Sequence, residues 1–386
     1  PVDRQDSNQF DIRVDNNLTD KFNWFGRYSF YDSLLFRPAP RPGLAEGSFN
    51  DTFGAADLRS QGLAIGANYI FSPRIVNDFR FGFAKGDFFQ NPPNFGSGCP
   101  EALIGLRGAP TDESICGGLP VFNFPGGIQR RLGRTTSVPQ FQPPRSYDFR
   151  DAITMNRGAH VFKFGGEFLH VQTGILDVGS LLGNFDFSGR FSNQNGQWQG
   201  AIADLLMGFP TRYQQDSRTV FNMFQRMVFT YFQDDWKVNR RLTVNLGIRY
   251  EYSTPPIERD GQAANWNFQT RSFQQANTNG NLYERSLIYP DNNNFAPRVG
   301  LAFQATTRTV IRAGYGMFFN HSNRQGREGL LGFNPPFIIL ADSNIGGAGR
   351  LLDTQANIKL DRGIPAGFVD ISRVNLATVG RRAQDQ

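Results

Sequence analysis

Apolar and polar residues alternate over long stretches of this chain, and this pattern constrains its fold most. In Arg241–Tyr252 (RLTVNLGIRYEY) every second residue is aliphatic or Tyr, and the residues between are Arg, Thr, Asn, Gly and Glu. Successive side chains of a β-strand point to opposite faces, so the stretch predicts a strand with one apolar and one polar face. Alternation of varying completeness predicts further strands, about ten in all: Phe10–Leu18, Phe22–Phe36, Leu63–Phe71, Ile75–Lys85, Tyr147–Met155, Phe162–Phe168, Met223–Trp236, Val299–Phe303 and Ile311–Phe319.

The connections between these strands alternate strictly between short and long. The short turns lie around Thr19–Lys21, Ser72–Arg74, Arg157–Ala159, Asn239–Arg240 and Thr306–Arg308. The long stretches are Arg37–Asp57, Gln90–Arg145, Thr173–Asn222, Ser253–Asn294 and the residues after Asn320. In an antiparallel up-and-down sheet this order places every short turn at one edge and every long loop at the other. Outer-membrane barrels have this asymmetry.

Composition fits a barrel wall that separates lipid from water. Aromatic residues make up 14% of the 386 residues, yet only 39% are hydrophobic and the mean hydropathy is −0.42. No apolar run is long enough for a transmembrane helix. In lipid every backbone polar group must pair within the protein, so a spanning sheet must close on itself. A large soluble β-protein with one packed face explains the alternation but not the loop asymmetry.

Other segments give weaker signals. The stretch Gln199–Gly208 (QGAIADLLMG), followed by Pro210, predicts one short helix within a loop. The tail after Phe337 predicts no strand. The net charge of +6 comes from scattered basic residues, which indicates a solvated surface and no nucleic-acid partner. Cys99 and Cys116 lie in one Gly- and Pro-rich stretch, where a disulfide closing the loop is expected; two buried free thiols are the alternative.

Three segments together resemble the barrel of TonB-dependent outer-membrane receptors, in particular the Oar-like group with a carboxypeptidase-regulatory-like domain. They are Tyr231–Tyr252, Asn292–Phe319 and Asn156–Glu167, and Ala203–Pro210 (ADLLMGFP) also fits that group. The resemblance implies a barrel of about 22 strands with a plug domain and a TonB box, in the outer membrane of a diderm bacterium. It also implies partners: outer-membrane lipid, the plug, TonB and a large external ligand such as a siderophore, cobalamin, glycan or peptide.

The chain differs from that pattern in its extent. It has room for about ten strands, and neither a plug nor a final strand ending in an aromatic residue is recognisable. Residues 1–386 are therefore expected to form part of a single barrel domain, as an internal fragment that does not transport alone. A structural or adhesive outer-membrane protein, or a passive porin without TonB coupling, is the alternative, and a soluble β-sheet binding module is a weaker one.

No motif points to catalysis, a cofactor or a metal site, so no enzyme is expected. The three histidines are scattered, and neither a P-loop nor a nucleophile elbow is present. A charge on a lipid face costs about 2–4 kcal/mol for Arg or Lys at the midplane. The strand charges are therefore expected to face the lumen, where they line a ligand path or brace the wall as ion pairs: Arg80, Lys163, Glu167, Arg249, Glu251, Arg298 and Arg312.

Aromatic residues of the longest loop are the candidates for first contact with an external ligand. They are Phe95, Phe122, Phe124 and Phe141, which can stack on a ligand or pack the loop on itself. Aromatic residues near strand ends, among them Trp24, Trp236, Tyr250 and Tyr252, suit the girdles that mark the two membrane interfaces.

Overall fold

A long antiparallel sheet dominates the computed structural model, which describes residues 2–41, 43–45, 53–125, 131–176, 179–192, 196–321, 331–343 and 358–369. Ten strands follow the order β1-β2-β3-β4-β8-β9-β12-β13-β17-β18. Their bounds are β1 Arg4–Thr19, β2 Phe22–Arg37, β3 Gly54–Ser72, β4 Ile75–Asn91, β8 Pro144–Arg157, β9 His160–Ile175, β12 Phe221–Lys237, β13 Leu242–Ser253, β17 Phe295–Gln304 and β18 Val310–Gly316. All ten strands predicted from the alternation are present.

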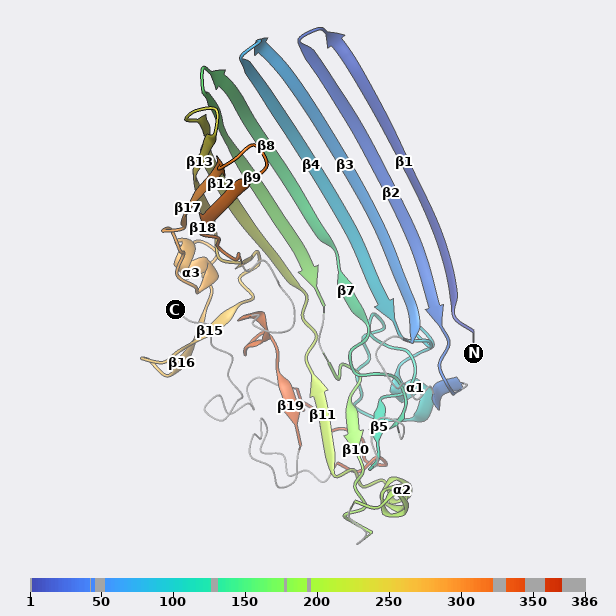
Figure 1. Cartoon of the computed structure of the whole chain (residues 1–386). Helices are drawn as coiled ribbons and strands as arrows, with labels where there is room; N and C mark the ends of the chain where they lie inside the picture. The colour runs from blue at the N-terminus through green and yellow to red at the C-terminus, as the bar shows by residue number, and fades with distance from the viewer. Residues whose placement is uncertain are drawn as a thin grey trace.

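The two ends of this sheet differ, as the alternation of turns and loops predicted. The turns of the hairpins β1–β2, β3–β4 and β8–β9 lie together at the upper end in Figure 1. The long connections gather at the opposite end, below the strands. The sheet is curved, and every neighbouring pair along it is antiparallel.

Strand register separates the side chains into an apolar face and a polar face. The apolar face carries Phe81 of β4, which pairs in register with Ile65 of β3 and Phe149 of β8. The polar face carries Arg80, whose partners are Gly66 and Arg150. Large apolar side chains remain exposed on the apolar face of all ten strands, for example Phe10, Phe36, Tyr69, Phe79, Phe149, Phe164, Phe232, Ile248, Leu301 and Tyr315. This surface is one that lipid, and not water, would cover.

The apolar face changes character toward the long-loop end. On β3 the apolar residues run from Phe71 to Leu63, close to the roughly nine residues that a tilted strand needs to cross a bilayer. Beyond them, Asp32, Arg59 and Asp87 lie opposite one another on three neighbouring strands. Arg59 Nε lies 2.8 Å from Asp32 Oδ1. The strands therefore continue past the apolar band into a polar region.

The long loops build a second, smaller structure that the sequence did not reveal. A five-stranded sheet has the order β19-β11-β10-β5-β6. Its strands are β5 Val121–Asn123, β6 Arg131–Leu132, β10 Asn184–Asp186, β11 Arg212–Asp216 and β19 Leu340–Asp342. The expectation that no strand follows Phe337 is therefore wrong, because β19 pairs with β11. This loop sheet has an apolar core of its own, which includes Phe122, Phe185 and Tyr213.

Short helices and strands complete the loop end of the molecule. The predicted helix is present as α2, Trp198–Met207, and it ends at Gly208 in the left-handed conformation. The remaining elements are α1 Pro100–Ile104, α3 Leu282–Ser286, β7 Gln140–Gln142, β14 Ile257–Glu258, β15 Ala264–Asn267 and β16 Ser272–Gln275. No helix in the described ranges has the length and hydropathy needed to cross a membrane.

Candidate functional site

The predicted lumen-facing charges all lie on the polar face. Register places Lys163 opposite Gln233, which in turn pairs with Gly247 and, through it, Arg298. The same counting places Arg80, Glu167, Arg249, Glu251 and Arg312 on this face. One face of the sheet therefore collects the charges that an apolar surface would exclude.

Five charged residues of the polar face and one histidine form a continuous row, which we call the charged row. Its members are Asp148, Arg150, Glu167, Arg249, Glu251 and His321. Arg150 Nη2 lies 2.6 Å from Asp148 Oδ2 and 3.1 Å from Glu167 Oε1. Arg249 lies 3.7 Å from Glu167 and 2.7 Å from Glu251. Opposite charges thus alternate along the row from β8 to β13.

The row ends at His321, which follows the last strand. His321 Nε2 lies 2.6 Å from Glu251 Oε2, and Glu251 is almost completely buried. Arg249 also lies over the ring of Phe229, with its guanidinium carbon 4.7 Å from the ring centroid. Arg249, Glu251 and His321 are therefore held in the row by both ionic and aromatic contacts.

The other predicted charges have separate environments. Arg80 pairs with Asp78 at 2.7 Å and lies over the ring of Phe25. Lys163 contacts Asp235 at 3.3 Å. Arg298 lies over the ring of Phe318, and Arg312 is exposed. The structure thus brings Glu167, Arg249 and Glu251 together, and leaves the other predicted charges outside the row.

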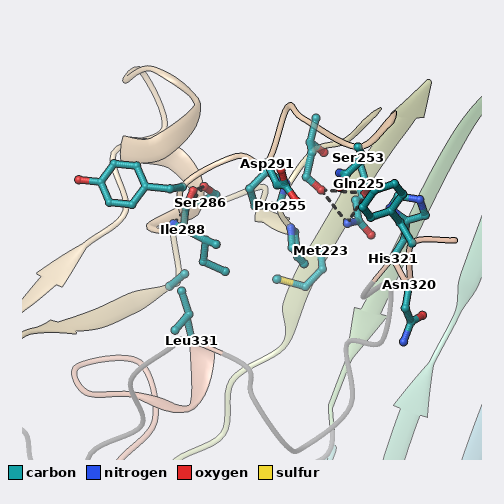
Figure 2. A pocket seen from close by; sticks show the side chains of 16 residues that line it. Met223, Gln225, Ser253, Pro255, Ser286, Ile288, Asp291, Asn320, His321 and Leu331 are labelled. Atoms are coloured by element: carbon teal, nitrogen blue, oxygen red, sulfur yellow. Dashed lines mark hydrogen bonds between the residues drawn. The ribbon is translucent and has the colours of Figure 1, made fainter. Parts of the chain in front are cut away.

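A cavity of about 300 Å³ opens beside the charged row, toward the long-loop end of β12 and β13. His321 lines it as well as contacting Glu251. Figure 2 shows Met223, Ile288 and Leu331 around its apolar part, and Gln225 with Ser253 around its polar part. Gln225 donates hydrogen bonds to Ser253 Oγ at 3.0 Å and to the Thr254 carbonyl at 2.6 Å. The cavity combines an apolar wall with fixed polar groups, as small-molecule sites do.

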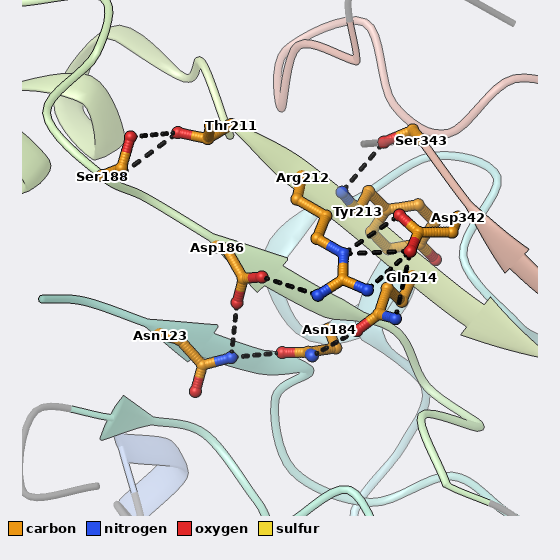
Figure 3. A network of polar contacts seen from close by, with 10 residues as sticks. All are labelled: Asn123, Asn184, Asp186, Ser188, Thr211, Arg212, Tyr213, Gln214, Asp342 and Ser343. Carbon is orange, nitrogen blue, oxygen red and sulfur yellow. Dashed lines mark hydrogen bonds and ion pairs between the residues drawn. The ribbon is translucent and has the colours of Figure 1, made fainter. Parts of the chain in front are cut away.

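The loop sheet carries a second polar cluster (Figure 3). Arg212 of β11 forms a bidentate salt bridge with Asp342 of β19: its Nε lies 3.0 Å from Oδ1 and its Nη2 2.6 Å from Oδ2. Its Nη1 lies 3.7 Å from Asp186 Oδ2 of β10. Asn123 donates to Asp186 at 2.7 Å and to Asn184 at 2.5 Å. Burial raises the pKa of Asp186, whereas the hydrogen bond to Asp342 raises the pKa of Arg212. Four short strands from distant parts of the chain, β5, β10, β11 and β19, are joined by this cluster.

The four loop phenylalanines differ in what they contact. Phe122 and Phe124 are 6% and 5% exposed and pack against Phe185, Phe187 and Trp198 in the core of the loop sheet. They pack the loop on itself and present almost no surface to a ligand. Phe141 is partly buried and packs against Phe89, with ring centroids 4.6 Å apart. Phe95 is 39% exposed, so it alone of the four presents a large free surface.

Cys99 and Cys116 form a disulfide in the same loop region, with a Cα–Cα distance of 4.8 Å. Gly96 donates its backbone N–H to the Cys116 carbonyl at 3.1 Å, which ties the two sides of the loop together beside the bridge. In the described part of the chain, no cluster of three or more His, Cys, Asp or Glu side chains is arranged to hold a metal ion.

Sequence reasoning missed three members of the charged row: Asp148, Arg150 and His321. Asp148 and Arg150 had a signal, because they alternate with Tyr147 and Phe149 in a strand that was predicted. His321 had none. It lies after the last strand, and its contact with Glu251 depends on how the chain turns back over the polar face.

Comparison with known proteins identifies the family. The family model described as an outer membrane beta barrel domain matches residues 1–382. A search of curated proteins found no significant match. Among solved structures, the alcaligin outer-membrane receptor FauA of Bordetella pertussis is 9% identical, with a TM-score of 0.44 over 81% of this chain and 35% of that one.

Two further structures are similar to the same extent. FpvA of Pseudomonas aeruginosa, bound to a heterologous pyoverdine, is 11% identical with a TM-score of 0.45, over 81% of this chain and 35% of that one. The ferric-catecholate import receptor Fiu of Escherichia coli is 11% identical with a TM-score of 0.41, over 81% of this chain and 46% of that one. This chain thus spans less than half of each structure. From the family match over nearly its whole length, the chain belongs to the outer membrane beta barrel domain family and lies in the outer membrane of a Gram-negative bacterium.

Proposed function

We propose that this chain forms part of the wall of an outer-membrane receptor that imports a large ligand with energy supplied through TonB. The charged row on the polar face carries the proposal, because membrane-crossing strands keep such charges only where a watery lumen receives them. The segment resemblance to the Oar-like receptors supports it further. We also propose that residues 1–386 belong to a single barrel domain without an enzymatic step.

The arrangement of the site supports a path from the outside inward. In this family the long loops are external and the short turns periplasmic. The cavity lies at the long-loop end of the polar face, and His321 connects it to Glu251 in the charged row. A ligand arriving from outside would meet the loops, including Phe95, then the cavity, and then Arg249 and Glu167. Arg80, Lys163, Arg298 and Arg312 would line the same lumen on either side.

Uptake in cells tests this proposal. Strains carrying the intact gene, a deletion, or the gene in a tonB-deficient background would be compared for accumulation of radiolabelled siderophores, cobalamin, oligosaccharides and peptides. Accumulation of one of these that needs both the gene and TonB supports the receptor. Accumulation that needs the gene but not TonB, together with ohmic conductance of the purified protein in planar bilayers, would establish the passive porin instead.

A variant on the path refines the test. Arg249→Gln removes the centre of the charged row and is expected to lower ligand accumulation several-fold at unchanged protein level in the outer membrane. The matched control is Arg308→Gln, which removes a similar charge from the β17–β18 turn at the opposite end of the strands. Equal loss in both variants would show that the charged row has no special part in transport.

A further inference from the structure

The apolar face ends toward the long loops in a line of rings. Phe83, Tyr147 and His170 lie opposite one another on β4, β8 and β9, with ring centroids 5.1 Å apart for the first pair and 6.1 Å for the second. The ring of Phe224 on β12 follows at 6.0 Å from His170. Aromatic rings in such a line are typical of the level where hydrocarbon gives way to headgroups.

Basic side chains gather along this line. Arg226 of β12 pairs in register with His170, and its guanidinium carbon lies 5.6 Å from the Phe224 ring centroid. Arg285 of α3 lies over the same ring at 5.8 Å. Arg145 precedes Tyr147 by two residues on β8, so the two lie on the same face. Arg145 is exposed, as is Arg226. We call Arg145, His170, Arg226 and Arg285 the basic cluster.

Among the described residues, the basic cluster differs from the neighbouring charges in having no salt bridge to a carboxylate. Lys85 and Arg59, on the same face, pair with Asp87 and Asp32 at 2.7 and 2.8 Å. Within the described ranges, no carboxylate forms a salt bridge with the arginines of the basic cluster, and the buried Nε of Arg285 has no hydrogen-bond partner. The carboxylate of Asp260, in the loop after β14, forms a salt bridge with Arg259 and accepts a hydrogen bond from Asn222. The cluster thus presents uncompensated positive charge at the lipid boundary.

A phosphate group is the anion that fits this position. Guanidinium groups bind phosphate oxygens through charge-assisted, often paired hydrogen bonds. The long loops are external in this family, so the cluster lies at the headgroup level of the outer leaflet. Lipid brings a phosphate there together with acyl chains that can cover Phe149, Phe168 and Val228, the next row of the apolar face.

We propose that the basic cluster binds the phosphate of a phosphorylated lipid in the outer leaflet of the outer membrane. The acyl chains of that lipid lie against the apolar face below the cluster, and the imidazole of His170 lies beside Arg226 in register. The site is on the opposite face of the sheet from the charged row. The inference therefore rests on the family and the register, and not on the proposed transport.

The test uses the protein purified from outer membranes in a non-ionic detergent. Fluorescent lipid A carrying both phosphates would be titrated against it, with enzymatically dephosphorylated lipid A and inorganic phosphate as the two comparison probes. Arg145→Gln/Arg226→Gln is expected to weaken binding of the phosphorylated lipid at least fivefold. The matched control, Arg308→Gln, removes an exposed arginine from the β17–β18 turn at the opposite end of the strands and should bind like the parent.

Three results would overturn the proposal. They are equal affinity for the dephosphorylated lipid, unchanged binding by the double variant, and displacement of the lipid by inorganic phosphate at matching concentration, which would identify a free-phosphate site. If the double variant does not fold, as judged by the heat-modifiable mobility of barrels on gels, Arg226→Gln alone is expected to weaken binding two- to threefold. No change in that single variant would count against the site equally.

Discussion

Glu251 and His321 lie 2.6 Å apart, although 70 positions separate them in the chain. The contact ties the segment after β18 to the polar face of β13, and it places a histidine at the meeting point of the cavity and the charged row. Glu251 serves two partners at once, because its other oxygen accepts a hydrogen bond from Arg249 at 2.7 Å. The Glu251 carboxylate therefore links Arg249 of β13 to His321 of the segment after β18.

Glu251→Gln should therefore loosen both contacts. The amide keeps one acceptor but loses the charge that holds Arg249 and His321, so we expect a loss of about 1–3 kcal/mol in local stability. Hydrogen exchange measured by mass spectrometry should show faster exchange in 317–321 than in the parent. Exchange in β2 and β3, far from Glu251, serves as the internal control and should not change.

The assignment of faces predicts opposite results for two arginine substitutions on β13. Ile248→Arg places a charge on the apolar face and should cost about 2–4 kcal/mol in lipid. Asn245→Arg changes the polar face, where the new side chain can still donate to Asp235, the present acceptor of Asn245 at 2.6 Å. Urea titration of the protein folded into vesicles would measure both. A larger loss in Asn245→Arg would invert the faces.

The Cys99–Cys116 bridge should stabilise the loop end and leave the wall unaffected. The bridge closes a loop with a sequence separation of 17, for which chain entropy gives about 3 kcal/mol in the unfolded-state model. Cys99→Ser/Cys116→Ser is expected to speed proteolysis between Pro92 and Pro120 in intact cells. Reduction of the parent with dithiothreitol should reproduce this effect, and equal cleavage rates before and after reduction would contradict it.

The polar cluster of the loop sheet predicts a pH effect with a definite sign. Because burial raises the pKa of Asp186, the folded loop sheet holds this proton at a higher pH than the unfolded chain does. The contribution of Asp186 to stability is therefore most favourable below its ordinary pKa and declines as the pH rises through the raised value. Asp186→Asn should abolish that decline and stabilise β10 at neutral pH.

Asp342→Asn is the contrasting variant in the same cluster. It breaks the bidentate salt bridge with Arg212, so the loop sheet should lose about 1–3 kcal/mol of stability. Hydrogen exchange of β10 and β11 between pH 4 and 7 distinguishes the two variants. Destabilisation by both at neutral pH would show that Asp186 contributes as an ion, against the direction assigned here.

The wall could be predicted from the sequence because each strand meets lipid on one side and water on the other. The residues at which the strands begin and end could not be predicted from the sequence. β3 was predicted as Leu63–Phe71 but begins at Gly54, because ladder hydrogen bonds continue past the membrane, where Asp57 and Arg59 interrupt the apolar pattern. The loop sheet escaped detection because strands such as Val121–Asn123 are too short to show a period.

Phe25 shows why the face of a single residue can also be misjudged. It lies on the polar face, where its ring covers Gly66 and is flanked by the guanidinium groups of Arg13 and Arg80, at 4.2 and 5.1 Å from the ring centroid. The missing side chain of Gly66 provides the room, and the two cations make an aromatic ring favourable among charges. Neither condition is visible until strands β1 to β4 are placed side by side.

The separation of turns and loops to opposite ends of the strands also determines where the chain can change length during evolution. Inserting one residue into β4 would turn Arg80 toward lipid and Phe81 toward the lumen, and every residue beyond the insertion would follow. The tight turns tolerate inserted residues hardly better than the strands do. Length variation among homologues should therefore collect at the external end, since lengthening an already long loop costs little closure entropy. New binding specificities can arise there by insertion while the wall stays in register.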